Sequence, residues 1–405
     1  MLVFVLNKDG KPLMPCSPRK ARILLKEKKA KVVSMKPFTI QLIYGSSGYK
    51  QKVYAGRDRG LTQGVAAVRE DEKILYVGEI KGRIDVSEKV YARACLRRSR
   101  RSRKTRYRKP RFLNRKRSEG WLPPSVSHLW LEHEKIKQSV ERILPIFAWG
   151  EEYNKFDTRK MSDPGVKNYQ KGPLSGKRNV REYILERDSY RCVLCDTPER
   201  LESHHIVWRF RGGSDRPKNL VTLCSQCHDK VTRGEIKIAK VYDSYKWPAR
   251  LNSLNPRFNS SGAVLVSPSR VKEARKELRL NKSHTEDALA VIYCAFKIKP
   301  QRKDTPKIRR GRFVRTHNRQ THKSLPVKGG KRPVYEVNKF LINKQGVRFE
   351  KRDLVKHQKK GVVGYIQSLK SSGTVVVADW KGKGLRGFSS NSLRKVQNGS
   401  CIVWK

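Results

Sequence analysis

Two pairs of cysteines, with a pair of histidines between them, constrain the fold of this chain more than any other feature. The first pair is Cys192 and Cys195, and the second is Cys224 and Cys227. Two thiolates three positions apart clasp one side of a metal ion, and a second such pair completes a tetrahedron, so the spacing predicts a structural Zn²⁺ site. This pattern alone would also suit a treble-clef knuckle that binds nucleic acid and cuts nothing.

The same segment carries polar residues that a zinc ion does not need. His204 and His205 stand together, Asn219 follows, and His228 comes directly after the last cysteine. Together they resemble the HNH (ββα-metal) endonuclease family over roughly residues 178–235. The resemblance implies that His205 is the general base that deprotonates the attacking water, and that Asn219 holds the loop presenting it. It also implies that His204, where the family often has Asp, and His228 bind one Mg²⁺.

The charge of the chain indicates its class of partner. There are 93 Lys and Arg against 36 Asp and Glu, a net charge of +57. Such an excess needs a polyanion to neutralise it, and we expect nucleic acid. We expect no membrane association, because no apolar run approaches the ~20 residues that span a bilayer and the start does not read as a signal peptide. The scattered remaining cysteines favour a reducing cytoplasm; they are Cys16, Cys95, Cys294 and Cys401.

The first 50 residues alternate short apolar strands with a basic helix. The pattern predicts strands near residues 3–6, 31–33 and 38–42 and a helix over 18–30, with Ile23, Leu24 and Leu25 facing inward. The segment Lys11-Pro12-Leu13-Met14-Pro15 resembles the signature of the PLMP domain of the IscB family, which are transposon-encoded RNA-guided nucleases. Residues 21–25 and 36–42 fit that domain as well.

This resemblance implies a RuvC nuclease core, an RNase H-like fold split into three pieces whose carboxylates hold two Mg²⁺ ions. Asp58, after an apolar strand, takes the metal position of the first piece. Glu152 takes it in the second by its spacing before Phe156, with Glu151 as the rival. In the third piece, His284 is expected to take part in catalysis and Asp287 to bind metal.

The neighbours of Asp58 depart from the family pattern. The family usually has a Gly-Ile-Asp-Pro-Gly type of run here, whereas this chain has Arg57 before Asp58 and Arg59 after it. Two cations beside a metal ligand would lower its pKa or crowd the metal ions. We therefore expect Arg57 and Arg59 to affect the activity of this centre.

The most basic stretch lies between the first two pieces. It has neither Gly nor Pro from Val86 to Lys109, so it predicts a long helix, or else a disordered basic tail. Arginines on every face suit contact with RNA phosphates, like the bridge helix of the IscB family. The expected RNA-binding residues are Arg93, Arg97, Arg98, Arg100, Arg101, Arg103, Arg106 and Arg108.

The fold expected overall is a multidomain α/β protein. The predicted segments are 1–50 (PLMP domain), 51–85 (RuvC-I), 86–130 (arginine-rich bridge helix and RNA-contacting segment), 131–177 (RuvC-II and linker), 178–238 (HNH domain with zinc knuckle), 239–300 (RuvC-III) and 301–405 (basic linker and C-terminal domain). The last part reads as a basic linker followed by short β runs up to Cys401–Trp404, and predicts a small β-barrel-like domain. By resemblance, that domain interacts with the target-adjacent motif.

The function implied by resemblance is that of an RNA-guided DNA endonuclease. A guide (omega) RNA would pair with double-stranded target DNA, the HNH domain would cut the guide-paired strand, and RuvC the displaced strand. The protein would be a monomer within a ribonucleoprotein, in a prokaryotic cytoplasm near the nucleoid. The alternatives are an HNH homing-type endonuclease without guide RNA and a non-catalytic RNA-binding protein.

Overall fold

The computed structural model divides the chain into two compact units. It describes residues 2–46, 48–101, 118–157, 179–208, 213, 215–238, 246–302, 305–314, 340–370 and 372–405, without the side chains of residues 100, 101 and 246. The first unit comprises residues 1–83, 128–154 and 256–405, and the second comprises 84–127 and 155–255. Within the described ranges, no helix combines the length and apolar character needed to cross a membrane.

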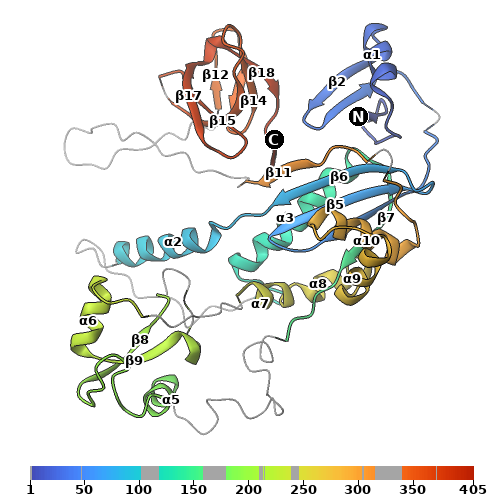
Figure 1. Cartoon of the computed structure of the whole chain (residues 1–405). Helices are drawn as coiled ribbons and strands as arrows, with labels where there is room; N and C mark the ends of the chain where they lie inside the picture. The colour runs from blue at the N-terminus through green and yellow to red at the C-terminus, as the bar shows by residue number, and fades with distance from the viewer. Residues whose placement is uncertain are drawn as a thin grey trace. The chain divides into compact units, whose positions relative to one another are not determined.

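The first unit begins with a small α/β lobe (Figure 1). Strands β1 (Phe4–Leu6), β3 (Phe38–Leu42) and β2 (Ala30–Met35) form a sheet in that order, beside helix α1 (Pro18–Lys26). Ser17 caps α1, and the helix ends before Lys28, which has a left-handed φ of 55°. The prediction that Ile23 faces inward is wrong: its side chain is 47% exposed, and Ala21 is the buried residue of the helix, because the helix presents a different face to the sheet.

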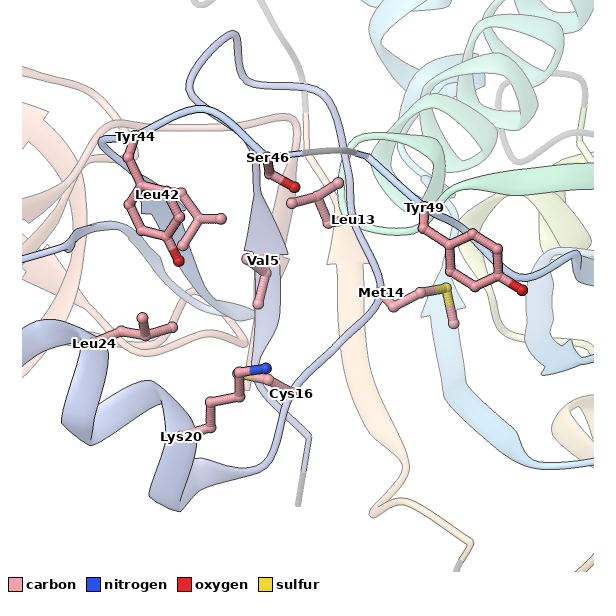
Figure 2. Close-up of a pocket in the computed structure, with 10 residues that line it drawn as sticks. All are labelled: Val5, Leu13, Met14, Cys16, Lys20, Leu24, Leu42, Tyr44, Ser46 and Tyr49. Carbon is pink, nitrogen blue, oxygen red and sulfur yellow. The ribbon is translucent and has the colours of Figure 1, made fainter.

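A cavity of about 350 Å³ lies in this lobe (Figure 2). Its walls come from β1, α1, β3 and the segments that follow β1 and β3. The lining residues are Val5, Leu13, Met14, Cys16, Lys20, Leu24, Leu42, Tyr44, Ser46 and Tyr49. The lining mixes apolar side chains with polar groups of Tyr44, Ser46 and Tyr49, and its charged member is Lys20, so it does not have the donor set of a metal site.

A seven-stranded sheet forms the centre of the first unit, in the order β10-β7-β4-β5-β6-β11-β19. The strands are β4 (Val53–Asp58), β5 (Thr62–Arg69), β6 (Ile74–Lys81), β7 (Ile146–Glu152), β10 (Val264–Val266), β11 (Arg309–Phe313) and β19 (Ile402–Trp404). β4, β5 and β6 make an antiparallel meander, whereas β7 runs parallel to β4, and β10 parallel to β7. The three pieces predicted to form one core therefore contribute to one sheet or pack on it.

Strands β11 and β19 show that the prediction for the chain beyond residue 300, a basic linker followed by a β-rich domain, is wrong in part. β11 lies in the stretch expected to be a basic linker, and it pairs in parallel with β6. β19 was expected in a β-barrel-like domain but pairs antiparallel with β11. Ile402 and Trp404 are buried in the core of the large sheet, which is the physical reason that the last strand leaves the C-terminal domain.

Helices cover both faces of the sheet. On one face, Ile136 and Val140 of α3 (Pro124–Glu141) pack against Val65 and Ala67. On the other face, α10 (His284–Phe296) packs its apolar residues against Ala66 and other residues of β5 and β6, beside α9 (Pro268–Glu277). Because side chains alternate along a strand, β5 serves both layers.

Glycines let α10 come very close to the sheet. A Cβ at Gly64 would lie 1.7 Å from the carbonyl oxygen of His284, and a Cβ at Gly56 would lie 2.2 Å from that of Ala288. Any side chain at these positions would push the helix away. The first turn of α10 is therefore held directly over the end of β4.

The C-terminal part of the first unit is a separate antiparallel sheet in the order β17-β16-β15-β14-β18, with a two-stranded sheet β12-β13. Its elements are β12 (Phe340–Ile342), β13 (Arg348–Glu350), β14 (Leu354–His357), β15 (Val363–Leu369), β16 (Thr374–Ala378), β17 (Gly384–Ser389), η3 (Ser390–Ser392) and β18 (Leu393–Gln397). Phe349, Val355 and Ile366 lie in its apolar core.

The second unit contains a β-hairpin followed by a helix. Its elements are α2 (Val86–Arg101), α5 (Val180–Arg187), β8 (Leu201–His205), η2 (Pro217–Asn219), β9 (Leu220–Cys224), α6 (Ser225–Arg233) and α7 (Lys246–Asn252); α8 (Asn255–Asn259) begins at its end. β8 pairs antiparallel with β9, and His205 lies opposite Leu220. This β-β-α arrangement carries His204, Cys224, Cys227 and His228, whereas Cys192 and Cys195 precede it, between α5 and β8.

Candidate active sites

The carboxylates predicted for the first centre come from strand ends and from the start of a helix. Because Arg57 lies opposite Glu151 in the parallel β4–β7 pair, the next residues, Asp58 and Glu152, end their strands side by side. Nδ1 of His284, the first residue of α10, lies 2.5 Å from Oδ2 of Asp58. The fold thus joins residues 226 positions apart in one polar cluster.

The pKa of Glu152 reflects this crowding. Burial, then the hydrogen bond and charge of Asp58 and the charge of Asp287, raise it to about 8. A carboxyl group that neighbouring carboxylates keep protonated is one that a divalent cation would stabilise in its charged form. Asp287 itself forms an ion pair with Arg275 of α9. The donor set at this sheet edge therefore fits Mg²⁺.

The two glutamates of β7 have different surroundings, because neighbouring residues of a strand face opposite sides. Glu151 is 1% exposed, and its Oε1 lies 2.5 Å from a guanidinium nitrogen of Arg57. Arg57 also donates a hydrogen bond to the carbonyl of His133 in α3. This buried pair faces α3, whereas Asp58 and Glu152 face α10. Of the two rivals, Glu152 is the one that the structure places beside Asp58.

The arginines that flank Asp58 are both occupied. Arg57 lies in the buried pair with Glu151. Nε of Arg59 donates to the backbone carbonyl of Glu152, and its guanidinium lies 3.9 Å from the centre of the Phe258 ring. Two effects were expected of these cations, a lower pKa of Asp58 or crowding of the metal ions; Arg57 faces His133 and Glu151 on the other face of the sheet, away from the metal position.

The described part of the arginine-rich segment is a helix. α2 has 16 residues, and Arg93, Arg97 and Arg98 on it are exposed. The side chains of Arg100 and Arg101, and the whole of Arg103, Arg106 and Arg108, lie outside the described residues.

The four cysteines of the second unit converge. Their sulfur atoms lie within 4.8 Å of one another, and those of Cys195 and Cys224 are 3.6 Å apart. A tetrahedral Zn²⁺ with bonds of about 2.3 Å needs sulfurs about 3.8 Å apart, so the four thiols fit it. In the described ranges, no other group of at least three His, Cys, Asp or Glu side chains comes this close.

One of these thiols is already acidic. Burial raises the pKa of Cys192, but backbone hydrogen bonds from Cys224, Leu194 and Cys195 outweigh that effect and lower it to about 7. A thiol with a lowered pKa gives up its proton to a metal ion more readily. Burial and the neighbouring thiols raise the pKa of Cys227 to about 12, so the lowered pKa belongs to Cys192 and not to the whole cluster.

Two histidines face each other across the hairpin and the helix. The rings of His204 on β8 and His228 on α6 have centres 4.9 Å apart. Nε2 of His204 is buried and has no hydrogen-bond partner among the described residues. Burial, and then the charges of His228 and His205, lower the pKa of His204, which keeps the imidazole in the neutral form that binds metals. The imidazoles of His204 and His228 therefore fit a second cation in this domain, besides the Zn²⁺ of the four cysteines.

His205 and its loop are held by hydrogen bonds. Nε2 of His205 lies 2.8 Å from Oδ1 of Asp215. Asn219 is fully buried; its Oδ1 accepts from the amide of Val207, and its Nδ2 donates to the carbonyl of Val207. The structure thus brings together each residue predicted for this centre.

Comparison with known proteins assigns this region. Residues 192–234 match the family described as HNH endonuclease. The chain carries an HNH endonuclease domain. A 70-residue stretch, 17% of this chain, is also 34% identical to anaredoxin of Nostoc sp. (strain PCC 7120 / SAG 25.82 / UTEX 2576) and covers 91% of that protein. Residues 3–172 match a family described as RRXRR protein, and residues 97–101 read Arg-Arg-Ser-Arg-Arg.

The HNH domain contains acidic residues that the motif did not indicate. Glu202 lies two residues before His204 on the same strand, and its Oε2 is 3.7 Å from Nδ1 of His228. This distance is that of an ion pair and is too long for a hydrogen bond, so Glu202 lies beside His228 without fixing which ring nitrogen carries the proton. The period of two along β8 could have suggested Glu202, whereas Asp215 lies outside the strands and no pattern indicated it.

Proposed function

We propose that this protein is an RNA-guided DNA endonuclease of the IscB type, with two separate nuclease centres. The HNH domain supports nuclease activity. The observation that carries the rest is the meeting of Asp58, Glu152 and His284, from three pieces of the chain that the arginine-rich helix and the HNH domain interrupt. An HNH nuclease that works alone has no use for this second cluster.

At the sheet edge, Asp58, Glu152 and Asp287 would hold two Mg²⁺ ions, forming a RuvC-type centre that cuts the displaced strand. Bound divalent cations would neutralise charge that develops on the scissile phosphate. His284 lies against Asp58, and this hydrogen bond raises the pKa of the imidazole. A protonated His284 would donate to the phosphate or to the leaving group.

In the HNH domain, His204 and His228 would hold the cation, and His205 would accept the proton of the attacking water. Asp215 faces Nε2 of His205, which favours the tautomer protonated there and leaves the lone pair at Nδ1. This centre would cut the guide-paired strand.

The nucleic-acid partners follow from charge. The net charge of +57 and the exposed Arg93, Arg97 and Arg98 support contact with the phosphates of a guide RNA. Base pairing would select the DNA, and the protein would hold the heteroduplex by its backbone. The C-terminal sheet would read the target-adjacent motif. The ribonucleoprotein would contain one copy of the protein and act in the cytoplasm near the nucleoid.

The test begins with the RNA that co-purifies with the protein. Sequencing should yield one structured RNA, and changing its guide portion should redirect Mg²⁺-dependent plasmid cleavage. Replacing Arg97, Arg98, Arg101 and Arg103 together with alanine should abolish RNA binding, while the matched lysine variant should retain part of it. Cleavage without any RNA would favour a homing-type nuclease, and RNA binding without cleavage a non-catalytic role.

A further inference from the structure

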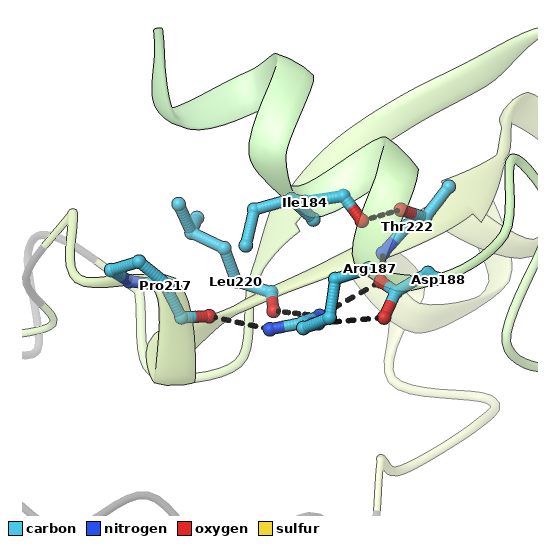
Figure 3. A network of polar contacts seen from close by, with 6 residues as sticks. All are labelled: Ile184, Arg187, Asp188, Pro217, Leu220 and Thr222. Atoms are coloured by element: carbon cyan, nitrogen blue, oxygen red, sulfur yellow. Dashed lines mark hydrogen bonds and ion pairs between the residues drawn. The ribbon is translucent and has the colours of Figure 1, made fainter. Parts of the chain in front are cut away.

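One arginine, Arg187, donates hydrogen bonds to the turn that carries Asn219, both before and after that residue. Arg187 is the last residue of α5, and Figure 3 shows its guanidinium pointing at this turn. Nη1 donates to the carbonyl of Pro217 at 2.8 Å, and Nη2 donates to that of Leu220 at 2.9 Å. The two acceptors flank Asn219 in sequence, so the planar fork spans the turn as one rigid piece.

Arg187 is itself fixed in place. Asp188 accepts from its Nε and its Nη2, both at 2.8 Å, in a side-on pair (Figure 3). The same carboxylate accepts from the amide of Thr222 in β9, and the hydroxyl of Thr222 donates to the carbonyl of Ile184. Asp188 has 7% of its side chain exposed and Arg187 has 24%. This network therefore ties α5 to β9 under little solvent screening.

The turn transmits this restraint to His205. Leu220, whose carbonyl Arg187 holds, lies opposite His205 in the hairpin. The carbonyl of Asn219 accepts from the amide of Ile206 at 2.9 Å, and its side chain binds both backbone groups of Val207. The two residues that follow His205 are thus bonded to the turn that Arg187 clamps.

We propose that Arg187 is a positioning residue of the HNH reaction, which holds the turn 217–220 so that Asn219 keeps His205 in place. The proposal rests on the proposed role of His205 as general base. Lysine keeps the charge but has no planar fork, so it cannot span both carbonyls. Small displacements of a catalytic group cost up to about a hundredfold in rate.

The experiment uses the full chain with its RNA, and compares Arg187→Lys with Arg191→Lys. Arg191 also pairs with an aspartate of this domain, Asp196, but is 53% exposed and contacts no part of the turn 217–220 in the described structure. Arg187→Lys should speed hydrogen exchange in the peptide with Ile206 and Val207, and slow cleavage of the guide-paired strand about tenfold to a hundredfold. Zinc content and displaced-strand cleavage should not change, and Arg191→Lys should behave as wild type.

A double variant separates positioning from general stability. Because both residues act through one turn, Arg187→Lys should add little to the loss caused by Asn219→Ala. Full additivity, loss of zinc, or unchanged exchange near Val207 would overturn the proposal. If the wild type cuts no DNA, the exchange measurement still decides whether Arg187 holds the turn, and the proposed function fails instead.

Discussion

The two candidate centres are built from residues at very different distances along the chain. In the HNH domain, His205 and Asp215 are 10 positions apart, and the metal-binding candidates all lie between Cys192 and His228. At the sheet edge, Asp58 and His284 are 226 positions apart. Closing the longer loop costs more chain entropy, although that cost rises only slowly with length.

The difference lies in what holds each centre together. The HNH domain has a small apolar core of a few residues around Val221 and Leu223, with three of the cysteines among them. The sheet edge lies on two large apolar layers and on glycines that admit α10. One centre should therefore depend on a metal ion for its fold, and the other on close packing.

Removing the zinc ligands should have the largest effect. A structural Zn²⁺ contributes on the order of 10 kcal/mol of folding free energy, so Cys224→Ser should lose zinc and unfold the HNH domain. Guide-paired strand cleavage should vanish, while displaced-strand cleavage continues. Metal analysis and strand-specific end labels would report both; Cys16→Ser, outside the cluster, is the control. Unchanged zinc in Cys224→Ser would show that the ligands are misassigned.

Removing one catalytic group from each centre in turn should show which centre cuts which DNA strand. His205→Ala should slow cleavage of the guide-paired strand about a hundredfold to ten-thousandfold, because the base that takes the water proton is missing. Asp58→Ala should do the same to the displaced strand by removing a metal ligand. Each variant should nick supercoiled plasmid, and the double variant should bind without cutting. Equal loss on both strands in His205→Ala would mean that one centre gates the other.

Adding one methyl group at Gly64 should disturb only the centre at the sheet edge, which depends on the close packing of α10. In Gly64→Ala, the new Cβ would overlap the carbonyl of His284 at 1.7 Å, so α10 must move. We expect about 1–3 kcal/mol of lost stability and roughly a hundredfold slower displaced-strand cleavage. Thermal unfolding and end-labelled strands would measure these effects. Gly45→Ala, with no atom within 4 Å of its Cβ, is the control; equal behaviour of the two variants would contradict the packing argument.

The smallest effect concerns pH. The pKa of Glu152 is about 8, so below that pH a proton competes with Mg²⁺ for its carboxylate. The Mg²⁺ concentration for half-maximal displaced-strand cleavage should rise as pH falls below about 8, approaching about tenfold per unit, and stay level above it. The Mg²⁺ concentration needed to cut the guide-paired strand should not follow this trend near neutral pH, because the pKa of His204 in the HNH domain is lowered. A pH-independent requirement for Mg²⁺ at both centres would contradict this.

Much of the HNH domain could be predicted from the sequence because its contacts are local. The spacing of Cys192, Cys195, Cys224 and Cys227 predicted a cluster that the structure contains. His204, His228 and Asn219 also lie where the motif places them, since a hairpin and one helix leave few alternatives. The fork of Arg187 was not predicted, because its acceptors are backbone carbonyls, which no residue pattern records.

At the sheet edge, the sequence by itself determined which residue types end the strands and open the helix, since strand, glycine and capping patterns are local. Only the tertiary structure decided which of Glu151 and Glu152 lies beside Asp58, because strand pairing sets which side chain faces α3 and which faces α10. It also decided that β11 and β19 join the large sheet. The sequence of a short apolar strand does not indicate which strand it will pair with. The pairing is set by the free energy of burying the strand against residues distant in the chain.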